Sequence, residues 1–156
     1  MKVKAIPEGY HSLIPSLIVN NSVKAIEFYQ HVFGAMKRRV FNLPDGSTIH
    51  AELQFGDSIL MLSDEYPSMN ALSPISPGGG TSANLVLYVD NVDAVFENAL
   101  STGAKVTMPL NDTFRGDRAG GIEDPFGHRW MIATHIKDMS DEEVDKASKE
   151  FFAKNS

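Results

Sequence analysis

The sequence predicts an α+β fold of two similar modules followed by a C-terminal helix, and three observations carry this prediction. The first is an internal repeat: the segment from Leu17 to Tyr29 is echoed by the segment from Leu87 to Phe96. In both segments an apolar strand leads through an Asn-containing turn into a helix. The second is a later match, in which Phe55-Gly56 and Phe126-Gly127 each precede an apolar strand. The third is the alternation of polar and apolar residues from Thr48 to Phe55, which is typical of a strand with one buried face.

Three helices are expected. The first runs from Asn21 or Ser22 to Phe33, and its buried positions are expected at Ala25, Ile26, Tyr29, Val32 and Phe33. The second repeats this spacing with Val92, Val95, Phe96, Ala99 and Leu100. Gly34 and Gly103 stand where a helix C-terminus favours positive φ. The third helix, over about residues 140–153, is indicated by the capping-box pattern Ser140-Asp141-Glu142-Glu143.

We expect a single domain over residues 1–156. Module one covers about residues 10–65 and module two about residues 83–136. The stretch 66–82 between them is rich in Pro, Ser and Gly, which is a composition typical of a linker. Its Pro77-Gly78-Gly79-Gly80 run lacks the Lys and Ser/Thr of a phosphate-binding loop and leads into a strand, so it does not predict nucleotide binding.

Composition and charge exclude several classes of protein. The chain has 156 residues, 42% of them hydrophobic, which is enough for a sizeable core. It has no cysteine, which excludes disulfide scaffolds, zinc fingers, iron–sulfur clusters and thiol catalysis. The formal net charge of −6 argues against nucleic-acid binding, and no apolar run approaches the roughly 20 residues of a membrane helix. No secretory signal is visible at the N-terminus, so we expect a cytoplasmic protein without a membrane partner.

The strand from Thr48 to Phe55 carries the strongest candidates for catalysis. His50 and Glu52 lie two residues apart, so their side chains face the same way, opposite to the face that a helix covers. Four roles stay open for this pair. The carboxylate could orient the imidazole as a general base, or the two side chains could donate ligands to a metal. They could also contact a bound ligand, or form a polar pair without chemistry.

The paired modules resemble a known superfamily. The segments IEFYQHVFGA (26–35) and EDPFGHRWMIATH (123–135) are similar to those of the vicinal oxygen chelate proteins, which include glyoxalase I, fosfomycin-resistance enzymes, extradiol dioxygenases and bleomycin-resistance proteins. The run from Asp45-Gly46 through His50-Ala51-Glu52 to Ser63-Asp64-Glu65 resembles its PhnB-like, glyoxalase-related branch. The resemblance covers about residues 10–136. It implies βαβββ modules that form a curved mixed β-sheet with outer helices.

The resemblance also bears on cofactors. Metal-dependent members take one ligand from the first strand and one from the last strand of each module, and these positions fall here on Ile14, Leu60, Asn84 and Met131. Aliphatic side chains bind no metal, an asparagine is a weak ligand, and a thioether is too soft for the ions that this superfamily uses. No metal or other cofactor is therefore expected. A divalent ion at a non-standard site beside His50 and Glu52 is the alternative.

Ligand-binding residues are expected in module two. Alternation along its first and last strands selects Asn84, Tyr88, Arg129 and Met131. The segment from Phe114 to Gly121 adds Phe114 and Arg118, because arginine suits carboxylate or phosphate and the glycines let a ligand approach the backbone. The alternative for this segment is a glycine-loosened edge strand in which Arg118 pairs with neighbouring side chains.

These observations favour metal-independent binding of a small amphipathic molecule in a concave cleft. The alternative is a lyase, isomerase or transferase that acts on an oxygenated metabolite, with His50 as base and Glu52 as its orienter, so whether the protein is an enzyme stays open. A third hypothesis is an interaction module whose C-terminal helix docks a partner. A homodimer is expected, because the adjacent Phe151 and Phe152 cannot both face one core.

Overall fold

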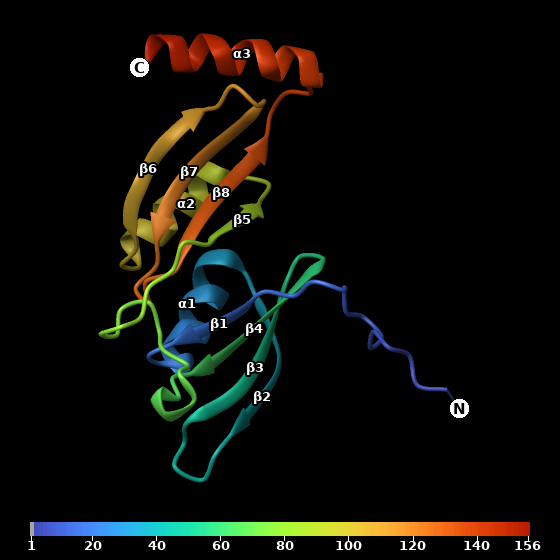
Figure 1. Cartoon of the computed structure of the whole chain (residues 1–156), viewed down its shortest axis with the longest axis vertical. Helices are drawn as coiled ribbons and strands as arrows, with labels where there is room; N and C mark the ends of the chain where they lie inside the picture. The colour runs from blue at the N-terminus through green and yellow to red at the C-terminus, as the bar shows by residue number, and fades with distance from the viewer. Residues whose placement is uncertain (1) are drawn as a thin grey trace. The chain divides into compact units, whose positions relative to one another are not determined.

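The computed structural model describes residues 2–156. The chain forms two compact units, of which the first ends at Ser82 and the second starts at Ala83. Each unit contains one four-stranded sheet and a helix that packs on one of its faces (Figure 1). The first five elements follow the same strand–helix–three-strand order in both units, and the order of strands in the sheet is also the same. The α+β fold of paired modules is therefore confirmed.

The first unit contains β1 (Ser16–Val19), α1 (Ser22–Phe33), β2 (Met36–Asn42), β3 (Thr48–Phe55), β4 (Ser58–Asp64) and the 3-10 helix η1 (Pro67–Met69). The strands lie in the order β1-β4-β3-β2, in which β1 runs parallel to β4 and the other pairs are antiparallel. β2 has a bulge between Lys37 and Arg39, where the pairing with β3 shifts by one residue. A bulge of this kind changes the direction of the side chains around it.

The second unit contains β5 (Asn84–Tyr88), α2 (Val92–Ser101), β6 (Lys105–Asp112), β7 (Asp117–Glu123), β8 (Arg129–His135) and α3 (Asp141–Lys154). Its strands lie in the order β5-β8-β7-β6, again with the first strand parallel to the last. The N-terminal caps also repeat: the Asn21 side chain accepts from the Lys24 backbone N–H, and the Asn91 side chain accepts from that of Ala94. The two asparagines of the sequence repeat thus start equivalent helices.

Helix packing explains most of the predicted buried positions. Tyr29 and Val32 of α1 are buried against the first sheet, and Val92, Phe96 and Ala99 of α2 are buried against the second. Val95 and Leu100 are half-buried. Gly120 of β7 lies under the ring of Phe96, and a Cβ at that position would come within 2.6 Å of it. This glycine therefore serves the packing of α2 on the sheet and not the approach of a ligand.

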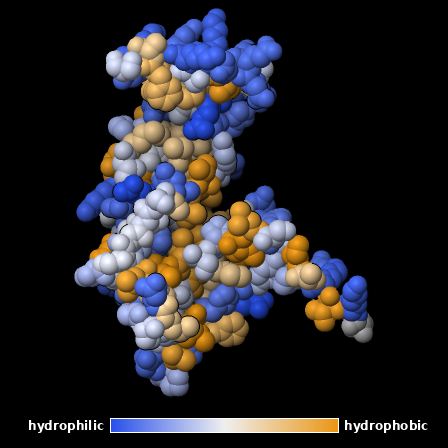
Figure 2. Space-filling model, viewed as in Figure 1, coloured by the Kyte–Doolittle hydropathy of each residue, from blue (hydrophilic) through white to orange (hydrophobic). Residues whose placement is uncertain are grey.

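The C-terminal helix α3 begins with the predicted capping box: the Ser140 hydroxyl accepts from the Glu143 backbone N–H, and the Glu143 carboxylate accepts from the Ser140 backbone N–H. None of its residues is buried. Hydrophilic residues cover most of the helix in the view of Figure 2, and apolar ones gather near its C-terminal end. Over residues 2–156 no helix is long and apolar enough to cross a membrane.

Candidate functional site

The face of the second sheet that points away from α2 brings four of the predicted ligand-binding residues together. The register pairs Asn84 with Arg129, and it pairs Val86 with Met131. Tyr88 follows Val86 on the same face of β5, because side chains two residues apart point the same way. The predicted residues Asn84, Tyr88, Arg129 and Met131 thus share one surface, which we call the open face of the second sheet.

Two adjoining cavities lie on this open face. The larger has a volume of about 370 Å³ and is lined by Val86, Tyr88, Arg115, Asp117, Met131, Ala133, His135, Asp141 and Val144. The smaller has a volume of about 250 Å³ and is lined by Asn84, Thr107, Met108, Gly121, Arg129, Trp130 and Met131. Met131 lines both. Small-molecule sites in proteins have volumes from about 300 Å³ upward, so the larger cavity is big enough for a ligand without the smaller one.

The floor of the larger cavity is apolar at one end. Val86 and Tyr88 are each 58% exposed, and Met131 lies beside Val86 on the neighbouring strand. This end of the cavity therefore offers apolar surface that a bound molecule could cover.

The other end of the cavity is polar and carries a hydrogen-bonded group formed by Tyr88, Asp117 and His135. The Tyr88 hydroxyl donates to Asp117 Oδ2 at 2.7 Å, and His135 Nδ1 lies 2.8 Å from Asp117 Oδ1. The second ring nitrogen, Nε2, lies 2.8 Å from Asp138 Oδ1. Because both ring nitrogens face carboxylates, the imidazolium form satisfies both contacts.

These contacts shift the pKa values in opposite directions. The bond to Asp117, followed by the bond to Asp138, raises the pKa of His135. Burial acts to raise the pKa of Asp117, but the bonds from His135 and Tyr88 outweigh it and the pKa is lowered. The bond to Asp117 raises the pKa of the Tyr88 hydroxyl, so this group stays a neutral donor. The cavity therefore presents an ion pair and a phenol beside apolar side chains.

Several residues of this cavity were not selected from the sequence. Arg115 comes from the turn between β6 and β7, and Asp117 is the first residue of β7. Asp141 and Val144 come from the first turns of α3. His135 could have been found, since it continues the alternation of Met131 and Ala133 along β8. The residues of α3 could not, because the sequence does not tell where an amphipathic terminal helix docks.

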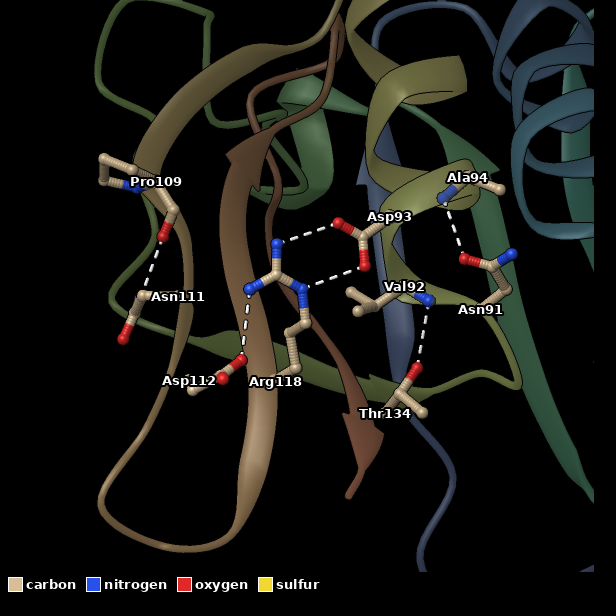
Figure 3. A network of polar contacts seen from close by, with 9 residues as sticks. All are labelled: Asn91, Val92, Asp93, Ala94, Pro109, Asn111, Asp112, Arg118 and Thr134. Carbon is tan, nitrogen blue, oxygen red and sulfur yellow. Dashed lines mark hydrogen bonds and ion pairs between the residues drawn. The ribbon is translucent and has the colours of Figure 1, made fainter.

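Arg118, which the sequence predicts as a ligand-binding residue, does not join the open face. It follows Asp117 on β7 and therefore points to the opposite side, toward α2. Its Nε and Nη2 atoms lie 2.9 and 2.8 Å from the two carboxylate oxygens of Asp93, and Nη1 lies 3.1 Å from Asp112 Oδ1 (Figure 3). The guanidinium of Arg118 on β7 thus connects α2 and β6. This agrees with the alternative given for this segment, in which Arg118 pairs with neighbouring side chains.

Phe114 also lies away from both cavities. Its ring packs against two aromatic rings of α3, with centroids 5.4 Å from Phe151 and 6.1 Å from Phe152. These contacts indicate that Phe114 attaches α3 to the turn between β6 and β7.

In the first unit, the structure brings His50 and Glu52 together. The His50 Nε2 atom lies 3.0 Å from Glu52 Oε1, and the Tyr10 hydroxyl lies 2.7 Å from both carboxylate oxygens. Glu52 is only 3% exposed. Burial would raise the pKa of this carboxyl, but the hydrogen bonds from His50 and Tyr10 and the charge of Arg39 outweigh it, so the pKa lies below its ordinary value.

The positions implied for metal ligands do not fit a divalent ion. Leu60 is buried on the helix side of the first sheet, so it is not the counterpart of Met131. That counterpart is Met61, because Met61 pairs with Ser16 of β1 as Met131 pairs with Val86 of β5. In neither unit do these side chains offer a donor set for a hard ion: the first unit has Ile14 and Met61, and the second has Asn84 and Met131. Within residues 2–156, no three His, Asp or Glu side chains form a group that could hold a metal.

Comparisons with known proteins agree with this fold. Residues 11–132 match the model of the Glyoxalase/Bleomycin resistance protein/Dioxygenase superfamily. The chain is 37% identical over 138 residues to the uncharacterized protein Mb0911c of Mycobacterium bovis. The aligned residues make up 87% of this chain and 91% of Mb0911c. TioX from Micromonospora sp. ML1 superposes with a TM-score of 0.63 at 25% identity, over 81% of this chain and 99% of TioX.

A PhnB protein from Bacillus cereus, described as a putative 3-demethylubiquinone-9 3-methyltransferase, superposes with a TM-score of 0.64. The superposition covers 80% of this chain and 99% of the PhnB chain. Because the two sequences are only 17% identical, this similarity shows the fold alone. The two repeated units, their strand order and the family match lead to one conclusion: the chain belongs to the glyoxalase/bleomycin resistance/dioxygenase superfamily.

Proposed function

We propose that the protein binds a small amphipathic molecule on the open face of its second sheet, without a metal ion. The observation that carries this proposal is the cavity of about 370 Å³, in which exposed apolar side chains adjoin an ion pair. An apolar ligand body would cover Val86 and Met131, and a polar group of the ligand would meet Arg115 or the Asp117–His135 pair. Such a division is usual in ligand sites, where apolar walls supply affinity and a few polar groups orient the ligand.

The fluorescent dye 1-anilinonaphthalene-8-sulfonate is a suitable probe, because it combines an apolar ring system with one anionic group. Val86→Ser removes two methyl groups from the cavity floor, and at about 0.8 kcal/mol per buried group the dye should bind about tenfold more weakly. Val106→Ser is the matched control, since Val106 is an exposed valine of the same sheet that lines neither cavity. Fluorescence titration measures both.

The proposal fails if Val86→Ser and Val106→Ser bind the dye equally well. Treatment with EDTA tests the part of the proposal that concerns metal. The affinity for the dye should be unchanged, and a loss of binding that added Zn²⁺ or Mg²⁺ restores would contradict metal independence.

A second candidate function is acid–base catalysis at His50, and the 3.0 Å contact of its Nε2 atom with Glu52 favours it. If Nε2–H donates to the carboxylate, Nδ1 keeps a free lone pair that can accept a proton. A lyase or isomerase that acts on an oxygenated metabolite would use this base to take a proton from carbon next to a carbonyl.

His50→Ala should then lower catalysed proton exchange by about 10²–10⁴-fold, the usual contribution of a general base. The exchange of the methyl protons of pyruvate in D2O, followed by NMR, is a direct measurement. His31→Ala is the control, because His31 is an exposed histidine of α1. An equal exchange rate in the two variants, with both folded, would remove the acid–base role.

The homodimer is proposed on the aromatic residues of α3. Phe151 is 46% exposed and Phe152 is 62% exposed, although both contact Phe114. The apolar end of α3 is visible in Figure 2. Aromatic side chains of this kind carry much of the binding energy when a second surface covers them.

Phe151→Ser/Phe152→Ser should therefore weaken self-association by at least about tenfold, the size of effect expected for interface anchors. Sedimentation velocity at micromolar concentration measures it, with Lys146→Ser on the same helix as the control. A monomeric native chain would contradict the dimer. A double variant that associates as tightly as the Lys146→Ser control would contradict the part assigned to α3.

A further inference from the structure

We propose that the first sheet carries a separate binding site for the oxyanion of a small aromatic acid, formed by Arg38, Arg39 and Phe41. It lies on the face that also carries His50 and Glu52. The proposal rests neither on ligand binding by the second sheet nor on catalysis by His50.

The β2 bulge creates the convergence of charge. Consecutive residues of a regular strand point to opposite faces, but the register shift between Lys37 and Arg39 inserts Arg38 as an extra residue. As a result both guanidinium groups approach one carboxylate oxygen. Arg38 Nε lies 3.6 Å and Arg39 Nε lies 3.4 Å from Glu52 Oε2.

Glu52 holds the two arginines but does not use up their charge. It supplies one negative charge to two guanidinium groups, so the cluster keeps an excess of positive charge. Tyr10 lies against the Arg38 group, whose carbon is 5.5 Å from the ring centroid, and Arg38 Nη1 donates to Gln54 at 2.9 Å. The Arg39 side chain is 50% exposed, and within residues 2–156 its guanidinium forms one side-chain ion pair, through Nε to Glu52, and no side-chain hydrogen bond.

The unused Nη groups of Arg39 are therefore the donors that would meet a ligand. The guanidinium fork matches a carboxylate or a phosphate, each of which can accept two parallel hydrogen bonds. The buried carboxylate fixes the position of the fork, which lowers the entropy that binding would cost.

An aromatic surface lies next to this fork. Phe41 is two residues beyond Arg39 on β2, about 7 Å along the strand, and shares its face. Its ring is 50% exposed and stacks on His50, with the centroids 6.2 Å apart and the planes at 19°. A flat ligand with an anionic group at one end would stack beside Phe41 while its oxyanion contacts Arg39.

The test uses the full chain labelled with ¹⁵N and follows the arginine Nε–H signals by NMR during titration with four probes. Benzoate and phenyl phosphate have the ring and the oxyanion, benzamide has the ring without charge, and acetate has the charge without the ring. We expect saturable shifts of the Arg38 and Arg39 signals with benzoate or phenyl phosphate, and the one that binds more tightly identifies the oxyanion. Acetate should bind about tenfold more weakly, since it leaves Phe41 uncovered.

Variants separate this site from general electrostatic attraction. Arg39→Gln should weaken benzoate or phenyl phosphate binding about tenfold, as expected for the loss of charge-assisted hydrogen bonds, and Arg39→Lys should be intermediate because it keeps the charge but not the fork. Lys24→Gln removes one positive charge from an exposed position of α1, and this variant should bind the probes as tightly as the native chain does. The proposal is overturned if benzamide binds as tightly as benzoate and phenyl phosphate. It is equally overturned if Arg39→Gln binds as tightly as Lys24→Gln, or if none of the probes gives a saturable shift in the native chain.

Discussion

Asp124→Asn is expected to lower the free energy of unfolding of the second unit by about 3 kcal/mol, because it leaves a buried donor without an acceptor. The Asp124 carboxylate is buried in the turn before β8. Its Oδ1 atom accepts from the backbone N–H groups of Phe126 at 2.9 Å and His128 at 3.0 Å, and its Oδ2 atom accepts from Trp130 Nε1 at 2.9 Å. An asparagine that keeps the two backbone bonds turns its NH2 group toward the indole N–H, so that two donors face each other.

A double-mutant cycle identifies this conflict as the cause. Trp130→Phe removes the indole N–H, so the cost of Asp124→Asn in that background should fall by about 1–2 kcal/mol. Hydrogen exchange of the β8 amides in urea measures the free energy of opening at this strand of the second unit. Asp90→Asn, at an exposed position, is the control for the change in charge. The explanation by two facing donors is refuted if Asp124→Asn lowers the free energy of unfolding by no more than Asp90→Asn does. It is also refuted if the loss caused by Asp124→Asn is the same in the Trp130→Phe background.

Glu52→Gln is expected to lower the free energy of unfolding of the first unit by about 2 kcal/mol, less than for a fully enclosed ion pair because the arginines are partly exposed. The substitution keeps the shape of the side chain, but it removes the charge that holds Arg38, Arg39 and His50. Hydrogen exchange of the β3 amides measures the loss. Glu27→Gln on the exposed face of α1 is the control.

The pH dependence gives an independent check on Glu52. Its pKa is lower in the folded chain than the ordinary value of 4.5, so its contribution is fully present above about pH 4.5 and is lost as the pH falls through the folded value. Other carboxyls with lowered pKa values add to the acid sensitivity of the native chain. The difference between the native chain and Glu52→Gln should therefore shrink below about pH 4.5. A difference that stays constant down to pH 2.5 would show that Glu52 contributes no such charge interaction.

Local patterns in the sequence were sufficient for the modules, the helices and the direction of several side chains. The repeated Asn-containing turns predicted where α1 and α2 start, because an N-cap side chain bonds to a backbone N–H only a few residues away. Strand alternation placed His50 with Glu52 on one face of the first sheet. On the second sheet it placed Tyr88 and Met131 on one face. These properties depend on residues that are near one another in the chain.

Relations between strands could only be decided by the tertiary structure. The metal-ligand position in β4 was assigned to Leu60, one residue from its structural counterpart Met61, because a strand's own alternation does not determine its register with a neighbour. Arg118 is predicted as a ligand-binding residue from the composition of its segment, and three glycines leave too little alternation there to show that its side chain faces α2.

The contacts that define both candidate sites join distant parts of the chain. Tyr10 reaches Glu52 from the N-terminal segment, and Tyr88 meets Asp117 across two strands that are not consecutive. The β2 bulge aims Arg38 and Arg39 at one carboxylate, which no spacing in the sequence predicts. The sequence by itself determined the repeated fold and the face on which most site residues lie, because helix and strand periodicity are local properties of the chain. The tertiary structure alone decided which of these side chains meet, because register, bulges and long-range contacts depend on how all four strands of a sheet pair at once.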